Sequence, residues 1–596
     1  MNPIRRSRFN RLPLLVATVA SLCAPLPARA ASDALAKLCD EYWQGYLRAH
    51  PVAATEIGDR RYDAMLEDNS AAGLSRETKR LEGLLTRARA IDARKLESVD
   101  RVNRSALIEE LGNQLAVASC HLERWNVDPR GGPQSEFMNL PDFTVIKSPE
   151  DAAHYVTRCR GMGLYMSNHI ANLASGLTGG LVANQEAVTK TLEQIDQLLA
   201  EKKPEKWAIA RPAQDAHADW SADDRAHFSK ELLDCVTEVV RPALVRYRAF
   251  LKDTIMPTAR QPEMAGLADL PGGMDCYRKL IRVHTSLDKT PTELHQLGLD
   301  EIKRIRTAIS DLGGKALGTT DFAQIQAKLR KDPAMHFKTA EEVEAEAEAN
   351  LARAKAAIPK WFHILPKADC QVKVMGMHEA PFSTIAYYRE PAADGSRPGY
   401  YMINTYKPKT RPRYEAEALA YHESIPGHHL QIAIAQELTG IPEFRKHQGV
   451  TAFVEGWGLY SERLADEMGL YTSDIDRLGM LSYDAWRASR LVVDTGMHAM
   501  GWSRQQAIDY MMQNTLLAQN NIENEVDRYM TDPGQALAYK CGQLEILRLR
   551  EEAKKRLGSR FDIKAFHDAV LRNGALALPV LREQVEAYIA DAVAAK

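Results

Sequence analysis

Apolar side chains recur at helical spacing through most of the chain. Near its start, Leu35, Leu38, Tyr42 and Tyr46 repeat at intervals of three or four residues, and Pro51 follows their segment. This period places the apolar side chains on one face of an α-helix. The pattern predicts a mainly α protein, and no repeat of fixed period is evident.

Several helix starts are marked by capping residues. Thr290 with Glu293 forms a capping box with Pro291 at the first helical position, and Gly313-Gly314 is predicted to end that helix. Three further pairs carry the same signal: Thr339 with Glu342, Ser503 with Gln506, and Asp532-Pro533 with Gln535. We interpret all of these boxes as structural.

One region between residues 371 and 404 breaks the helical rhythm. Its three short segments are rich in valine, tyrosine and threonine: Gln371–Met375, Ser383–Tyr388 and Gly399–Asn404. Pro381 and the turn-forming run 394–399 separate them. We expect a small antiparallel sheet there.

Prolines and glycines cluster between residues 255 and 275, as is typical of a boundary between lobes. This cluster divides the chain into a predicted N-terminal helical lobe, residues 31–265, and a larger C-terminal lobe, residues 266–596. The larger lobe is predicted to be helical, to include the small sheet at 371–404, and to carry the candidate catalytic residues.

The first thirty residues have the layout of a secretory signal peptide. Four arginines between residues 5 and 11 precede an apolar stretch at 14–26, and Ala28-Arg29-Ala30 is an A-x-A cleavage signal. The apolar stretch is too short to cross a membrane stably. We expect cleavage before Ala31, a periplasmic or secreted location, and no integral membrane segment afterwards. A buried N-terminal helix, a lipoprotein signal at Cys23 and twin-arginine export are alternatives that fit less well.

Composition narrows the class of protein. The 596 residues are 45% hydrophobic and 26% charged, which is ordinary for a soluble globular protein and argues against disorder or a multi-span membrane protein. The net charge is -2 and no long basic run occurs, so nothing supports nucleic-acid binding. The eight cysteines are scattered without a C-x-x-C pair, which argues against a cysteine-based zinc site. Their spacing does not predict a disulfide pairing.

The informative segment is 421–431, which reads Tyr-His-Glu-Ser-Ile-Pro-Gly-His-His-Leu-Gln and follows a strongly helix-forming run. In the H-E-x-x-H motif of zinc peptidases, two histidines four residues apart bind one zinc ion and the glutamate acts as a general base. His422 and Glu423 fit the first half of that motif. Pro426 stands where the second histidine would be, and proline cannot bind a metal.

The second histidine ligand is therefore His428 or His429. In an ideal helix six residues turn about 600°, which leaves His428 roughly 120° from the face of His422. Pro426 breaks a helix and Gly427 supplies backbone freedom, so a bulge there would return His428 to the metal. His429 has the right angle, at about 700°, but lies about 10.5 Å along the axis, which is long for two ligands of one ion. We predict His428; the alternative is a kinked helix whose histidines bind no metal.

Glu455 is the candidate third ligand. It lies 27 residues after His428, inside the apolar and aromatic stretch 452–460. An acid in such a helix is costly unless it is paired or bound to a metal. An ordinary buried salt bridge is the alternative interpretation of Glu455.

The motif H-E-x-x-P-G-H-H-x-Q resembles that of the bacterial family called domain of unknown function 885, a relative of the gluzincin metallopeptidases. Further stretches resemble the same family: 395–399 with Asn404-Thr405, Glu455-Gly456-Trp457, 494–498 and 533–540. The resemblance implies a multi-lobed helical protein with a deep cleft and a short sheet edge beside the metal helix. It implies that His422, His428 and Glu455 bind one Zn²⁺ ion and that Glu423 is the base. The two residues inserted before His428 depart from the gluzincin pattern.

The chemistry of such a site suggests further roles. Two histidines and one carboxylate leave zinc an open position for water, whose pKa the ion lowers. Glu423 would take the proton of that water and deliver it to the leaving amine. The developing oxyanion needs other donors, and we assign Tyr539 to this task with His498 as helper, its tautomer held by Asp494. Packing in the core is the alternative for Tyr539 and for His498.

We therefore expect an exported zinc-dependent metallopeptidase that hydrolyses a peptide substrate. An extended peptide could pair with the edge of the strand Gly399–Asn404 or Ser383–Tyr388. Two alternatives stay open. One is a non-catalytic periplasmic binding protein on a peptidase scaffold, against which the intact Glu423 argues. The other is a zinc hydrolase of a non-peptide amide, which the sequence does not separate from a peptidase.

Overall fold

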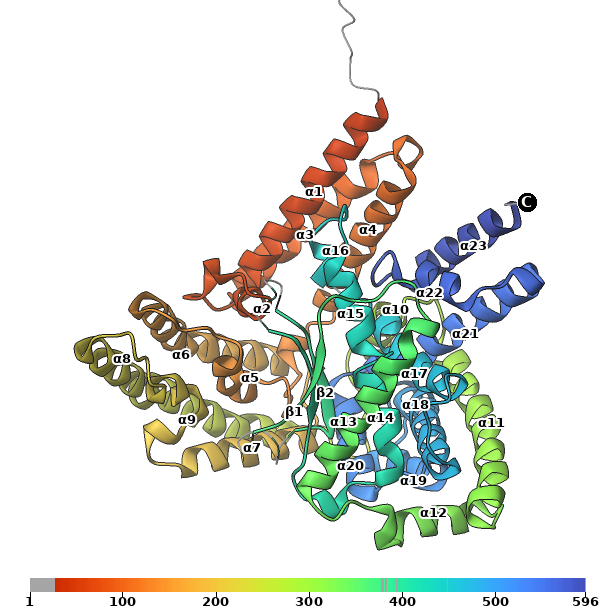
Figure 1. Ribbon diagram of the computed structural model, residues 1–596. Helices are drawn as coiled ribbons and strands as arrows, with labels where there is room; N and C mark the ends of the chain where they lie inside the picture. Colours follow the sequence, from red (N-terminus) through yellow and green to blue (C-terminus); the bar gives the residue numbers. More distant parts are fainter. Residues whose placement is uncertain are drawn as a thin grey trace, which may run out of the picture.

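The computed structural model describes residues 27–376, 380, 383–392, 395, 397–447 and 449–594. Within these residues the chain is mainly helical and contains one small three-stranded sheet (Figure 1). The predicted fold class is confirmed. Residues 1–26 of the predicted signal peptide lie outside the described residues. None of the helices in the described part is both long enough and apolar enough to cross a membrane.

The N-terminal part of the chain has two separate hydrophobic cores. The first lies among α1 (Pro27–Ala49), α2 (Pro51–Glu56), α3 (Ala71–Ala90) and α4 (Ser98–Ala118), drawn in red and orange in Figure 1. The second lies among α5 (Pro133–Asn139), α6 (Pro149–Thr178), α7 (Gln185–Ala200), α8 (Ala222–Cys235) and α9 (Arg241–Phe250). The range predicted as one lobe, 31–265, thus holds two helical bundles.

The largest core belongs to the C-terminal part of the chain, where the predicted site residues lie. The α-helices of this C-terminal part of the chain are α10 (Gly273–Thr285), α11 (Pro291–Leu317), α12 (Phe322–Lys331), α13 (Ala340–Ala357), α14 (Ala416–Glu423), α15 (His428–Glu437), α16 (Phe444–His447), α17 (Thr451–Glu467), α18 (Asp474–Met500), α19 (Arg504–Asn514), α20 (Gln519–Thr531), α21 (Ala538–Leu557), α22 (Ile563–Leu571) and α23 (Leu578–Ala594). A smaller apolar cluster joins α10 and α18 to the turn after α4, so the two parts of the chain pack together.

The predicted helix starts are mostly right and one predicted helix end is wrong. Thr290 and Ser503 form complete capping boxes, and Thr339 accepts the N–H of Glu342. α11 does not end at Gly313-Gly314 but continues to Leu317, and Gly318 ends it with φ +70°. Gly313 serves packing instead, because a Cβ there would lie 2.2 Å from the side chain of Ile325. Asp532 caps no helix start, since it follows α20 and α21 begins six residues later.

The prediction of an antiparallel sheet is wrong in part, because the sheet is mixed. β3 (Gly399–Ile403) lies in the middle, parallel to β1 (Cys370–Val374) and antiparallel to β2 (Ala386–Arg389). β3 lies between the two earlier strands instead of at the far edge of β2, so β1 and β3, which run in the same direction, are neighbours. β2 is consequently an edge strand, whereas β3 has both edges paired.

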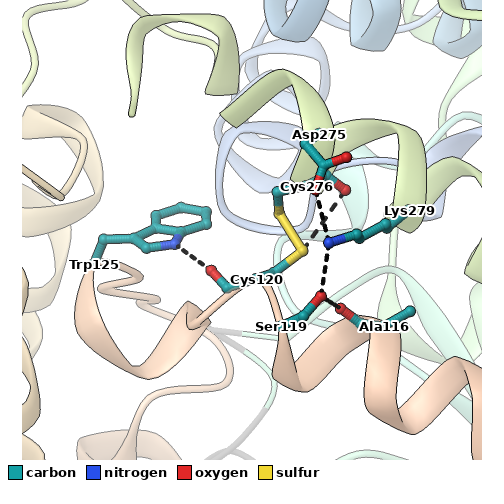
Figure 2. Close-up of a disulfide and its surroundings, with 7 residues drawn as sticks. All are labelled: Ala116, Ser119, Cys120, Trp125, Asp275, Cys276 and Lys279. Atoms are coloured by element: carbon teal, nitrogen blue, oxygen red, sulfur yellow. Dashed lines mark hydrogen bonds and ion pairs between the residues drawn. A yellow bond between two sulfur atoms is a disulfide. The ribbon is translucent and has the colours of Figure 1, made fainter. Parts of the chain in front are cut away.

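A disulfide joins the two parts of the chain. Cys120, in the turn after α4, pairs with Cys276 of α10, 156 residues later (Figure 2). Around it, the indole of Trp125 donates to the carbonyl of Cys120, and the ammonium of Lys279 donates to the hydroxyl of Ser119. The other cysteines of the described residues are buried and unpaired: Cys39, Cys159, Cys235, Cys370 and Cys541. The odd number of cysteines beyond the signal peptide leaves one or more free in any pairing.

Candidate metal centre

A break in the helix separates the two histidines of the motif. α14 ends at Glu423, and α15 begins at His428 after the four residues Ser424–Gly427. The carbonyl of Pro426 accepts hydrogen bonds from Nε1 of Trp457 at 2.9 Å and from the hydroxyl of Ser461 at 3.2 Å, so α17 satisfies it. Where the sequence predicted a bulge, the helix is broken completely. The break places His428 beside His422.

The break brings three side chains that can bind a metal together. The rings of His422 and His428 lie 4.6 Å apart between centroids, and Oε2 of Glu455 lies 3.5 Å from Nε2 of each. One ligand atom from each residue lies within 4.8 Å of the other two, and no second such group was found among the described residues. The sequence predicted these three residues as ligands, and the fold brings them together from α14, α15 and α17 (Thr451–Glu467).

His429 lies outside this cluster. Its Nε2 donates to the carbonyl of Ala368 at 3.1 Å, which leaves Nδ1 to accept from the hydroxyl of Tyr388 at 3.0 Å. Burial lowers the pKa of His429 to about 4, so its ring is neutral at physiological pH. Both ring nitrogens are occupied by the protein itself, which favours His428 as the second candidate ligand.

Glu462 supports His422 from the side opposite the cluster, and sequence reasoning missed it. The Nδ1–H of His422 donates to Oε1 of Glu462 at 2.8 Å, which directs Nε2 toward Glu455. Glu462 is buried, and its other charged neighbour is Arg487, 3.4 Å from Oε1. Carboxylates commonly fix metal-binding histidines in this way. The spacing could have revealed Glu462. It lies seven residues, about two helical turns, after Glu455, so both side chains lie on one face of α17.

The carboxylates determine the charge of the cluster. Burial opposes a charge on His422, but the neighbouring carboxylates of Glu455 and Glu462 outweigh it and raise the pKa of His422 to about 9. Burial also opposes ionisation of Glu455, yet the imidazoles of His422 and His428 that face it hold the pKa of Glu455 well below its usual range. The site therefore favours a cation, either a proton or a metal ion, between the imidazoles and Glu455.

Glu423 borders the same cavity as the three candidate ligands, a space of about 430 Å³. Burial raises the pKa of Glu423, and the charges of His428 and His422 oppose this rise only in part. A raised pKa makes a carboxylate a better proton acceptor. Glu423 therefore lies beside the three candidate ligands, where a general base is needed.

Tyr539 reaches the same cavity from α21. α17 and α21 approach so closely at Gly456 and Gly542 that a Cβ on Gly542 would lie 1.8 Å from the backbone of α17. Tyr539, less than one turn before Gly542, thereby lies near His422, with their rings nearly parallel and their centroids 6.4 Å apart. The guanidinium of Arg490 lies 4.3 Å from the centroid of the Tyr539 ring.

The assignment of His498 to the reaction is wrong. His498 is fully buried and does not border the cavity. Its Nε2 donates to the carbonyl of Tyr529 at 2.9 Å, and its Nδ1 accepts the N–H of Leu267 at 3.2 Å. Asp494 does not hold His498, because it accepts the N–H of Gly534 at 3.2 Å and another bond from a tyrosine hydroxyl. The segment 494–498 therefore bonds to neighbouring parts of the chain. Neither ring nitrogen of His498 is free to contact a substrate.

The cavity continues into a second part of about 570 Å³. The residues that border both parts come from the loop before α5, the segment before β2, and α14, α18 and α20: Arg130, Thr384, Ile385, Leu419, Trp486, Glu525 and Arg528. The cleft implied by the sequence is therefore present, and side chains from both parts of the chain line it. Sequence reasoning missed the arginines, which stand in no recognisable motif.

Comparison with known proteins gives the family. A family model described as "Bacterial protein of unknown function (DUF885)" matches residues 51–585. The chain belongs to the DUF885 family. As a DUF885 protein it is similar over 94% of its length to the "putative lipoprotein" from Colwellia psychrerythraea, with 26% identity, 99% of that chain covered and a TM-score of 0.87. Among curated proteins nothing matches the sequence.

A second solved structure shares the fold of this DUF885 chain. It is described as a "putative lipoprotein of unknown function" from Shewanella oneidensis, with 17% identity, 92% of this chain and 99% of that chain covered, and a TM-score of 0.72. The DUF885 membership inferred from the motif is thus confirmed. The relation to gluzincin peptidases stays a prediction, since neither structure is described by an activity.

Proposed function

We propose that this DUF885 protein is an exported, zinc-dependent metallopeptidase. The observation that carries the proposal is the meeting of Nε2 of His422, Nε2 of His428 and Oε2 of Glu455 in one cavity beside Glu423. Two imidazole nitrogens and one carboxylate oxygen form a ligand set of catalytic zinc sites, which keep a further position open.

The residues present fit a zinc ion. Oε2 of Glu455 is buried and has no hydrogen-bond partner among the described residues, although two imidazoles face it at 3.5 Å. An unsatisfied buried carboxylate oxygen between two ring nitrogens is costly unless a cation joins them. Glu462 also fixes the tautomer of His422 that offers Nε2 as a ligand. When bound there, zinc would polarise the scissile carbonyl and acidify a water molecule.

Two other side chains would act on the substrate. Glu423 would accept the proton of the attacking water and pass it to the leaving amine, since its raised pKa suits both steps. The hydroxyl of Tyr539 would donate to the oxygen on which negative charge develops, and the nearby Arg490 strengthens that donor electrostatically.

The sheet supports a peptide as substrate. β2 is an edge strand, and residues 384–388 border the cavity beside His422 and Glu423. An extended peptide could add to the free edge of β2 through backbone hydrogen bonds. β3, the other strand considered from the sequence, has both edges paired and is unsuited to this role.

Three observations support export. The predicted signal peptide at 1–30 provides the route, and the Cys120–Cys276 disulfide is of the kind that persists in oxidising compartments. The similar structure from Colwellia psychrerythraea is described as a "putative lipoprotein". We propose that the mature protein begins at Ala31 and is periplasmic or secreted.

The test combines metal analysis with a peptide-library digest, with and without a chelator. We expect about one zinc ion per chain and cleavage that stops on chelation and returns with zinc. Glu423→Gln should keep the metal and lower turnover by about 10²–10⁴-fold, because it removes the base. Glu443→Gln, an exposed change outside the cavity, serves as control. Cleavage at the wild-type rate by Glu423→Gln would reject the mechanism.

A further inference from the structure

The cavity beside the candidate metal centre contains positive side chains that share one partner. Arg490 and Arg528 each donate through Nη2 to the same atom, Oε2 of Glu525, at 2.9 Å. Their side chains are only 3% and 6% exposed. Nη1 of Arg490 has no hydrogen-bond partner among the described residues. Buried charge with incomplete partners is costly, so this wall of the cavity favours an additional anion.

A third arginine reaches the same place from the N-terminal part of the chain. Arg130 lies in the loop before α5, is exposed, and borders both parts of the cavity. Its side chain makes no ion pair or hydrogen bond in the part of the chain that the structure describes. Arg528 borders both parts of the cavity as well, so the two guanidinium groups share this wall. Desolvation and then the charge of Arg528 lower the pKa of Arg130.

The position of Arg130 is fixed by its loop. Nδ2 of Asn126 donates to the carbonyl of Thr531 at 2.9 Å, which ties the loop to the end of the helix that carries Arg528. The nearby acids do not neutralise Arg130. Asp128 accepts the backbone N–H of Arg130 at 2.8 Å. The charge of Asp532 acts to raise the pKa of Arg130, but Asp532 forms no ion pair with it among the described residues.

We propose that Arg130 binds a carboxylate of the substrate where the two parts of the cavity meet, beside the positive charge of Arg490 and Arg528. The inference rests on the proposed peptidase function. The fork of N–H donors on a guanidinium matches a carboxylate. Nη1 and Nη2 of Arg528 already donate to Gln535 and Glu525, so Arg130 supplies the hydrogen bonds and Arg528 contributes its charge. The carboxylate would belong to the C-terminus of a peptide or to an aspartate or glutamate side chain.

The test uses three versions of one short N-acetylated peptide that the wild-type protein cleaves: a C-terminal amide without acidic residues, the free acid, and the amide with one glutamine replaced by glutamate. We expect the wild-type kcat/KM for one acid-bearing version to exceed that of the neutral amide by about 10- to 100-fold. A preference for the free acid identifies the C-terminus, and a preference for the glutamate peptide identifies a side chain.

Arg130→Ala should abolish this preference by lowering kcat/KM for the acid-bearing peptide far more than for the neutral amide, while Arg130→Lys should retain part of it. Because Arg130 is exposed, its replacement should not disturb folding. The matched control is Arg246→Ala, an exposed arginine of α9 outside the cavity. Equal cleavage of all three peptides by the wild type would overturn the inference. So would an Arg130→Ala effect that is equally large on the neutral amide.

The two proposals fail in different ways. If the zinc-loaded protein cleaves no peptide, the peptidase proposal fails. Calorimetric binding of the same acid and amide peptides to the wild type and to Arg130→Ala then tests the arginines alone. Tighter binding of an acid-bearing peptide that Arg130→Ala abolishes would support carboxylate recognition, and equal or absent binding would reject it.

Discussion

Two segments of the large lobe carry buried histidines and acids, and they differ in what remains unsatisfied. Around His498 and Asp494, the ring nitrogens and the carboxylate bond to backbone and side-chain groups of neighbouring loops. Around His422 and His428, two ring nitrogens converge on Oε2 of Glu455, which has no hydrogen-bond partner in the described part of the chain. A buried polar constellation that is satisfied within the protein stabilises the fold. One that is left incomplete indicates a ligand.

The largest effect expected from this contrast is the difference in zinc affinity between variants of His428 and of His429, which are adjacent in the sequence. His428→Ala should lower zinc affinity by more than about 100-fold, since it removes one of three ligands, whereas its neighbour His429 is bonded to Ala368 and Tyr388. His429→Ala should retain the metal. Zinc content after dialysis, measured by mass spectrometry, checks this ranking. The reverse result would show that the wrong histidine was assigned.

Next in size is the effect of the Tyr539 hydroxyl. Tyr539→Phe removes one donor and little packing, so kcat should fall about 10- to 1000-fold at nearly constant KM. Tyr388→Phe is a suitable comparison, because Tyr388 borders the same cavity but its hydroxyl is bonded to His429. A raised KM with unchanged kcat would make Tyr539 a residue for substrate binding instead.

The metal affinity should also depend on pH. Without a metal, the carboxylates raise the pKa of His422 to about 9, so a proton occupies the site below that pH and zinc must displace it. The apparent affinity should therefore fall by about tenfold for each pH unit below 9 and level off above it. Competition with a chelator of known affinity between pH 6 and 10 measures this slope. A flat profile would contradict the proposed coupling of His422 to Glu455 and Glu462.

The smallest effect on the metal centre is expected from His498. His498→Ala leaves two buried backbone groups without partners, at about 1–3 kcal/mol each, so the free energy of unfolding should decrease. Zinc content should stay at the wild-type level. Denaturant unfolding combined with metal analysis separates the two properties. Loss of zinc at unchanged stability would contradict this purely structural role of His498.

The sequence predicted best where the signal was local. The His422-Glu423 pair, the helix break at Pro426 and the helix starts at Thr290, Thr339 and Ser503 depend on neighbouring residues, and these features are present. Glu455 could be proposed because an acid interrupts an apolar helix. The role of His498 could not be deduced, since it depends on Leu267 and Tyr529, which are distant in the sequence and contribute only backbone atoms.

Features set by long-range packing were beyond prediction. The order of the strands depends on β3 entering between β1 and β2, which the alternation of residues does not encode. Gly313 has the residue type of a helix end, yet its neighbour Ile325 requires a glycine for packing. Arg130 stands in no motif and acquires its position through the contact of Asn126 with Thr531.

The bond between Cys120 and Cys276 has a consequence for the integrity of the chain. It closes a loop that contains the whole bundle α5–α9 and the loop of Arg130. A cut by a protease anywhere between the two cysteines would therefore produce fragments that stay covalently joined. Such a nicked molecule would migrate as one species in a non-reducing gel and as two after reduction, and the wall of the cleft could remain in place.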